Sequence, residues 1–114
     1  MTENEYLIKL TSFLGNNQPV PVDLLRLSDE AVEDFSTSAP LWLIRGKLYW
    51  NADFEVISGN RIAAAIFEKA MELDPTLAEA YLLLGNNHDG IRDDPDRAME
   101  FHRKAAKFRG QMLG

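Results

Sequence analysis

The chain has 114 residues, of which 46% are hydrophobic, so one folded domain with a modest core is expected rather than disorder. Its 18 acidic and 12 basic residues give a net charge of −6, which disfavours nucleic acid and anionic membrane surfaces as partners. The absence of cysteine excludes disulfides, thiolate catalysis and cysteine-ligated metals. No apolar run approaches the ~20 residues that span a bilayer, and the start MTENEYLIKL lacks the pattern of a signal peptide. A cytoplasmic protein is therefore expected.

The first 38 residues are expected to form two helices. Thr2 and Glu5 have the spacing of a capping box, which starts the first helix, and Gly15 is well placed to end it. Pro21 suits the first turn of the second helix, whose pattern is interrupted near Ser28-Asp29. The apolar stripes recur at three- and four-residue steps; they contain Tyr6, Leu7, Leu10, Phe13 and Leu14, then Leu24, Leu27, Ala31 and Phe35.

A third helix, rich in aromatic residues, is expected to start near Pro40 after a cap in Ser36-Thr37-Ser38. Its end is open, because residues 51–57 (NADFEVI) suit either more helix or a loop. The triplet Ser58-Gly59-Asn60 is typical of a turn.

Helices over residues 61–73 and 77–89 follow, separated by a tight turn at Asp74-Pro75. Thr76 and Glu79 again have capping-box spacing. Gly85 lies within the second of these helices, where it costs about 1 kcal/mol relative to alanine, so a close contact with a facing helix is expected. Asp94-Pro95 predicts the start of a last helix. No segment has a convincing strand pattern, and an all-α fold of about six helices is predicted.

Two patterns repeat along the chain. Trp42-x2-Arg45-Gly46-x2-Tyr49 returns as Tyr81-x2-Leu84-Gly85-x2-His88. Ala63-x3-Phe67-x2-Ala70-x4-Pro75 returns as Ala98-x3-His102-x2-Ala105-x4-Gly110. This resembles the tetratricopeptide repeat, a 34-residue helix–turn–helix unit, and implies an α-α superhelix of antiparallel hairpins. The resemblance covers residues 39 to about 110 and implies repeats at 39–75 and 76–110 within a single domain.

The chain departs from the family pattern in three ways. Arg45 occupies a leucine position, His88 and His102 occupy aromatic positions, and about five residues are inserted between Tyr49 and Ala63. Residues 1–38 are either a degenerate third repeat or a helical cap. Either one supplies the extra element that two repeats need to bury a continuous core.

The resemblance implies a binding scaffold without chemistry of its own, which holds a peptide or helix of a partner protein in a concave groove. The family's groove positions fall on Leu43, Lys47, Trp50, Glu79, Leu82, Asn86 and Asp89. Trp50 is the expected anchor, unless it packs under the inserted segment. Lys47 and Asn86 are candidates to bind a carboxylate or a peptide backbone, or are plain solvated residues. The clamp with which some members grip acidic chaperone tails is not expected, because Glu79 and Asp89 would repel a carboxylate.

Self-association is the alternative function. Apolar residues lie on more than one side of the last helix, and no separate solvating helix follows it in the tail KFRGQMLG. A homodimer is therefore predicted through Met99, Phe101 and Phe108, or through the aromatic surface from Trp42 to Trp50.

Enzymatic chemistry is not expected. His88 and His102 lie in slots that buried aromatics fill in the family, so packed histidines are favoured over metal ligands. The acid pairs Asp29-Glu30 and Asp93-Asp94 are interpreted as charges at helix starts rather than a general acid–base pair. No phosphate-binding glycine loop is present, and no cofactor or metal is predicted.

Overall fold

A computed structural model describes the backbone of residues 1–14, 20–51, 56–90 and 95–113, and the side chains of residues 1–14, 20–51, 62–86 and 96–109. This part of the chain contains six helices and no strand, which confirms the all-α fold class. The helices are α1 (Glu3–Thr11), α2 (Val22–Asp34), α3 (Ala39–Trp50), α4 (Val56–Leu73), α5 (Ala78–Gly90) and α6 (Pro95–Leu113).

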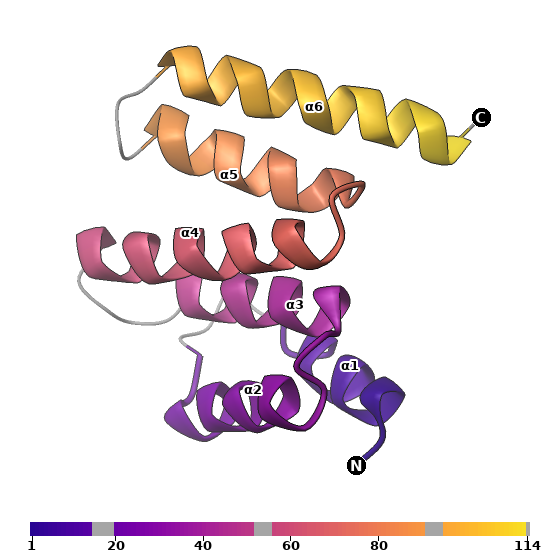
Figure 1. The fold of residues 1–114 in the computed structure, drawn as a ribbon. Coiled ribbons are helices and arrows are strands. Elements are labelled where there is room, and N and C mark those ends of the chain that lie inside the picture. The colour runs from indigo at the N-terminus through magenta and orange to yellow at the C-terminus, as the bar shows by residue number, and fades with distance from the viewer. Residues whose placement is uncertain (15–19, 52–55, 91–94, 114) are drawn as a thin grey trace.

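The helices follow one another through the molecule, with α1 and α2 at one end and α6 at the other (Figure 1). The tightest packing joins α3 to α4 and α5 to α6, and α4 packs on α5 between these two pairs. The α1 and α2 helices pack on each other and on α3. Each helix thus packs mainly on its neighbours in sequence.

Helix α3 is buried on two faces and joins two hydrophobic clusters. Leu41, Ile44 and Leu48 belong to a cluster shared with α1 and α2, whose other members include Tyr6, Leu10, Leu25 and Val32. Leu43, on the opposite face, belongs to a cluster shared with α4 and α5, together with Ala63, Ala64, Phe67, Ala70, Ala80 and Leu84. Helix α3 thus lies between the two clusters and is buried against both, which explains why it is apolar nearly all round.

Polar side chains cap α1 and α3 and connect the two helices. The predicted capping box is present: the Glu5 amide donates to Thr2 Oγ1 (3.2 Å) and the Thr2 amide to Glu5 Oε1 (3.1 Å). Ser38 caps α3 by accepting from the Leu41 amide, and its hydroxyl donates to Glu3 Oε1 of α1 at 2.7 Å. The bonds of Ser38 satisfy a buried hydroxyl that would otherwise lose its water partner on folding, whereas the exposed capping box satisfies free amides at the start of α1.

Helix α4 begins at Val56, so the turn predicted at Ser58-Gly59-Asn60 is wrong. These three residues lie in the first two turns of the helix, and Ser58 lies in the first turn, where amide groups need no carbonyl partner from within the helix. Extending an existing helix adds one hydrogen bond for each residue fixed, which offsets their weak propensity.

The break predicted near Ser28-Asp29 is also wrong, because α2 is continuous from Val22 to Asp34. Ser28 is fully buried, and its hydroxyl donates to the carbonyl oxygen of Leu25 within the same helix at 2.6 Å. This bond satisfies the hydroxyl without interrupting the helix.

The capping box predicted at Thr76 and Glu79 is wrong as well. The Thr76 amide and hydroxyl both donate to Asp74 Oδ1, at 3.1 and 2.7 Å, and α5 begins at Ala78. An Asx turn at Asp74 therefore takes the place of the cap. The hydroxyl of Tyr81 donates to the carbonyl oxygen of Pro75 at 2.8 Å and fastens the same turn to α5.

Two glycines let helices approach closely. A Cβ atom at Gly46 would lie 2.5 Å from Cε1 of Phe67, and one at Gly85 would lie 2.9 Å from the ring of His102. The contact with a facing helix predicted for Gly85 is thereby confirmed, and His102 is a packed side chain at that contact.

Candidate functional site

A pocket of about 220 Å³ lies between α3 and α5. Lys47, Trp50 and Asn51 line it from α3 and its C-terminal cap, and Leu83 and Asn86 line it from α5. It opens between two helices that are not consecutive in the chain, so neither helix forms it alone.

The packing of α4 sets the position of the α3 wall. Phe67 of α4 is fully buried and lies against Gly46, and its ring is 5.6 Å from the ring of Trp50, centroid to centroid. One face of the indole is thus covered by the core while another edge borders the pocket. A half-buried aromatic held in this way loses little conformational entropy when it binds a partner.

An ion pair joins the two walls. The Lys47 ammonium of α3 binds the Glu79 carboxylate of α5, with the two side chains 25% and 48% exposed. At this exposure the pair contributes at most about 1 kcal/mol to stability. Its larger consequence is electrostatic, because Glu79 offsets the positive charge that Lys47 would otherwise present to a ligand.

Two carboxamides supply the remaining polar groups. Asn51 Nδ2 donates to the backbone carbonyl oxygen of Lys47 at 2.8 Å. The side-chain oxygen of Asn51, Oδ1, remains as an acceptor. The carboxamide of Asn86 is the other, on an exposed side chain that lines the pocket. The pocket therefore combines the apolar surfaces of Trp50 and Leu83 with amide donors and acceptors, which are the groups that pair with a peptide backbone.

The structure brings together some of the predicted groove residues. Lys47, Trp50 and Asn86 line the pocket, and Glu79 is tied to it through Lys47. Leu43 is only 5% exposed and belongs to the core, because α4 packs over the side of α3 that carries it. The remaining two residues do not extend the pocket. Leu82 is half-buried outside the lining, and the side chain of Asp89 lies beyond the described residues.

Sequence reasoning missed Asn51 and Leu83. Asn51 directly follows the last residue of α3, in a segment whose structure the sequence pattern leaves open. Leu83 lies one position after the predicted Leu82, which is a rotation of about 100° around the helix. A pattern read along one helix cannot fix that rotation, since it depends on how α5 is turned against α3 and α4.

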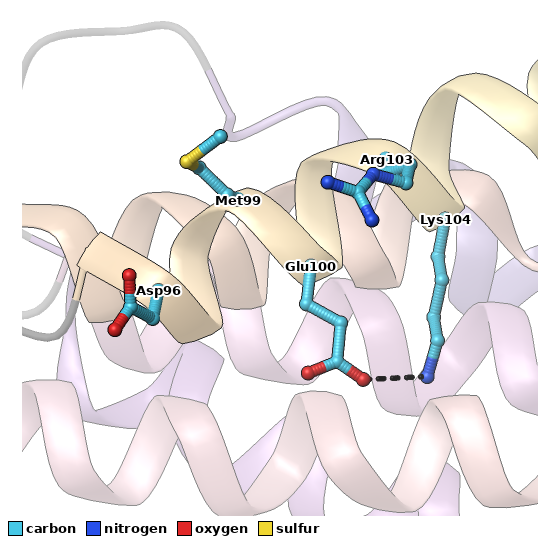
Figure 2. A pocket seen from close by; sticks show the side chains of 5 residues that line it. All are labelled: Asp96, Met99, Glu100, Arg103 and Lys104. Carbon is cyan, nitrogen blue, oxygen red and sulfur yellow. Dashed lines mark ion pairs between the residues drawn. The ribbon is translucent and has the colours of Figure 1, made fainter.

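The residues predicted for self-association divide between two sides of α6. Phe108 and Phe101 pack toward Tyr81 of α5, with ring centroids 5.1 and 6.5 Å from its ring, and both are half-buried. Met99 is 62% exposed on the other side, beside a shallow hollow of about 650 Å³ (Figure 2). Around it lie the charged residues Asp96, Glu100, Arg103 and Lys104.

A second polar cluster joins α2 to α3. Asp29 accepts from Arg45 Nε at 2.8 Å and from the Tyr49 hydroxyl at 2.9 Å. The Arg45 guanidinium carbon also lies 5.3 Å from the ring centre of Trp42 and 5.1 Å from that of Tyr49. Burial and the hydrogen bond to Asp29 raise the pKa of Tyr49.

This cluster gives Arg45 a structural role and corrects the interpretation of Asp29. Asp29 lies in the middle of α2 rather than at a helix start. Its carboxylate accepts hydrogen bonds from the Arg45 guanidinium and the Tyr49 hydroxyl of α3. The guanidinium covers apolar rings with its planar face and satisfies the carboxylate with its edge.

The described side chains include no group of three or more potential metal ligands. His102 packs against Gly85, while the side chains of His88 and of Asp93-Asp94 lie outside the described residues. None of the described helices is both long and apolar enough to cross a bilayer. Compared with family models and with curated proteins, the sequence gives no match.

Proposed function

We propose that this protein is a protein–protein interaction adaptor of the tetratricopeptide type, which binds a peptide or helix of a partner in the groove between α3 and α5. The observation that carries the proposal is the pocket itself, in which Trp50 and Leu83 face a ligand together with the carboxamide of Asn86. The repeated residue pattern supports the same assignment.

The size of the pocket favours a protein ligand over a free small molecule. Its volume of about 220 Å³ lies below the ~300–1,000 Å³ of typical small-molecule sites. Such a space accepts one apolar side chain of a longer segment, whose remaining residues contact the open groove on either side. A buried aromatic anchor surrounded by polar groups is typical of protein interfaces.

The charge of the pocket indicates that the partner segment is not recognised through a carboxylate. Lys47 is paired with Glu79, so the pocket offers a carboxylate no unpaired cation among the described residues. An acidic tail would have to displace Glu79 to reach Lys47, which works against binding. The proposed ligand is therefore a segment with an apolar anchor residue and no requirement for a terminal carboxylate.

Selection from a random peptide library, followed by titration of the selected peptides, tests the proposal. Trp50→Ala is expected to weaken binding about 30-fold, corresponding to a hot-spot loss of about 2 kcal/mol. Asn86→Ala is expected to weaken it about fivefold, the effect of one hydrogen bond. Met99→Ala, an exposed residue of α6, is the matched control and should change the Kd less than about twofold.

Trp50 also packs on Phe67, so thermal unfolding of Trp50→Ala must be compared with wild type before its affinity is interpreted. Asn86→Ala avoids this difficulty because its side chain is exposed and outside both hydrophobic clusters. Failure to select any peptide, or peptides that bind the Asn86 and Trp50 variants as tightly as wild type, would contradict the proposal.

A further inference from the structure

The charges of the chain are unevenly distributed between its two ends. Residues 1–38 contain seven acidic and two basic residues, a net charge of −5, whereas α6 contains two acidic and five basic residues, a net charge of +3. These two parts lie at opposite ends of the molecule, separated by α3, α4 and α5 (Figure 1). A chain of net charge −6 therefore ends in a basic helix.

The exposed side of α6 carries a stripe of charge around one apolar residue. Ala98 and Ala105 are buried on the side that packs on α5. The stripe, which consists of Asp96, Met99, Arg103 and Lys107, follows three- and four-residue steps on the side away from α5 and is exposed throughout. The hollow beside Met99 belongs to this side (Figure 2), and Glu100 and Lys104 pair with each other along its edge at 3.4 Å.

The exposed side of α2 has the opposite sign. Its stripe consists of Asp23, Arg26, Glu30 and Glu33, again at three- and four-residue steps, and all four are exposed. Val22, 62% exposed, adds one apolar residue at its start, as Met99 does on α6. The buried residues of α2, such as Leu25 and Val32, lie on the side toward the core.

From this distribution we infer that copies of the protein associate head to tail, with the α6 stripe of one copy on the α2 stripe of the next. Opposite charges meet in this arrangement and one exposed apolar residue on each side is covered. A symmetric pairing of α6 with α6 would instead oppose two helices of net charge +3. Because each contact uses two different surfaces, it does not close at the dimer, and further copies add until the assembly closes into a ring or extends as a filament. The inference does not depend on the groove between α3 and α5.

Analytical ultracentrifugation of the full chain tests this contact. In about 0.05 M salt the average mass should rise above the 12.9 kDa of one chain and continue past the dimer as concentration increases. In about 1 M salt, where the Debye length is ~3 Å, it should return toward one chain. A constant mass of one chain, or a plateau at the dimer, would overturn the inference.

Charge reversal then identifies the surfaces. Arg103→Glu with Lys107→Glu makes both ends acidic, and Glu30→Lys with Glu33→Lys makes the α2 stripe basic. Each double variant alone should remain a single chain, whereas an equimolar mixture should recover association, because the acidic α6 of one fits the basic α2 of the other. Association of the α2 variant on its own would assign the contact to paired α6 helices and refute the head-to-tail arrangement.

The fold of the two double variants is checked separately. Circular dichroism is expected to show wild-type helix content for both variants, since all four positions are exposed. If either variant does not fold, the concentration and salt dependence of the wild-type mass still tests the inference. If the wild-type protein stays a single chain yet binds an acidic peptide through α6, the inference of self-association is refuted. The α6 stripe then binds a different, acidic partner.

Discussion

Replacing Gly46 with alanine tests how closely α3 packs on α4. The added methyl would lie 2.5 and 2.7 Å from two ring carbons of Phe67, closer than real Cβ contacts allow. Phe67 is fully buried, so its ring cannot move outward, and the overpacking is expected to cost about 2–3 kcal/mol. Alanine returns about 1 kcal/mol through its higher helix propensity. The net loss of stability is therefore about 1–2 kcal/mol.

Gly85→Ala is the matched control for this substitution. Its methyl would meet the ring of His102 at 2.9 Å, but this side chain is only half-buried and its far end can rotate toward solvent. The contact cost of about 1 kcal/mol and the propensity gain of about 1 kcal/mol then nearly cancel. Gly85→Ala should consequently lie within about 0.5 kcal/mol of wild type.

Urea unfolding followed by circular dichroism measures both variants. The midpoint should fall for Gly46→Ala with an unchanged m value, and the melting temperature should drop by about 4–8 °C. A Gly46→Ala protein as stable as wild type would show that α3 does not approach α4 as described, and a Gly85→Ala protein that is the less stable of the two would show that the His102 ring cannot move aside.

Three further predictions concern the N-terminal part of the chain. Arg45→Lys should cost about 0.5–1 kcal/mol in urea unfolding although it keeps the charge, because lysine cannot both cover the neighbouring rings and donate through Nε to Asp29. The hydrogen bond to Asp34 raises the pKa of Tyr6 to about 12, so stability that is complete below about pH 10 should be lost as the pH rises toward 12. Thermal unfolding across this range should show a smaller loss for Tyr6→Phe, and an equal loss would contradict the assignment. Thr2→Ala should cost about 1 kcal/mol by removing the capping box, and thermal unfolding equal to wild type would show the cap to be dispensable.

Features that depend on neighbouring residues in sequence could be predicted. The Thr2 and Glu5 capping box forms as predicted because both partners lie in the same turn. Ser38 before α3 and Pro95 at the start of α6 likewise mark helix starts through local chemistry. The number of helices follows from such signals together with the apolar periodicity.

Features that depend on a distant competitor could not be predicted. Glu79 has the spacing to cap α5, yet its carboxylate binds Lys47 of α3. Asp29 was interpreted as a helix-start charge because its partner, Arg45, lies in another helix. In each case a tertiary contact outweighs a local preference that is worth only about 1 kcal/mol.

The candidate pocket shows the same division. The resemblance to the repeat family predicted Lys47, Trp50 and Asn86 as groove residues, and these residues line the pocket. It could not show that Leu43 is covered by α4, nor that Leu83 rather than Leu82 borders the pocket, because both depend on how helices are rotated against each other.

Backbone amide shifts of the isotope-labelled protein, recorded while a selected peptide is added, test the central claim most directly. Binding in the groove predicts that the largest shifts fall on Lys47, Trp50, Leu83 and Asn86, and that α1 and α2 are little changed. Largest shifts on α2 or on the exposed side of α6, with the pocket residues unchanged, would contradict the claim that the space between α3 and α5 receives the partner.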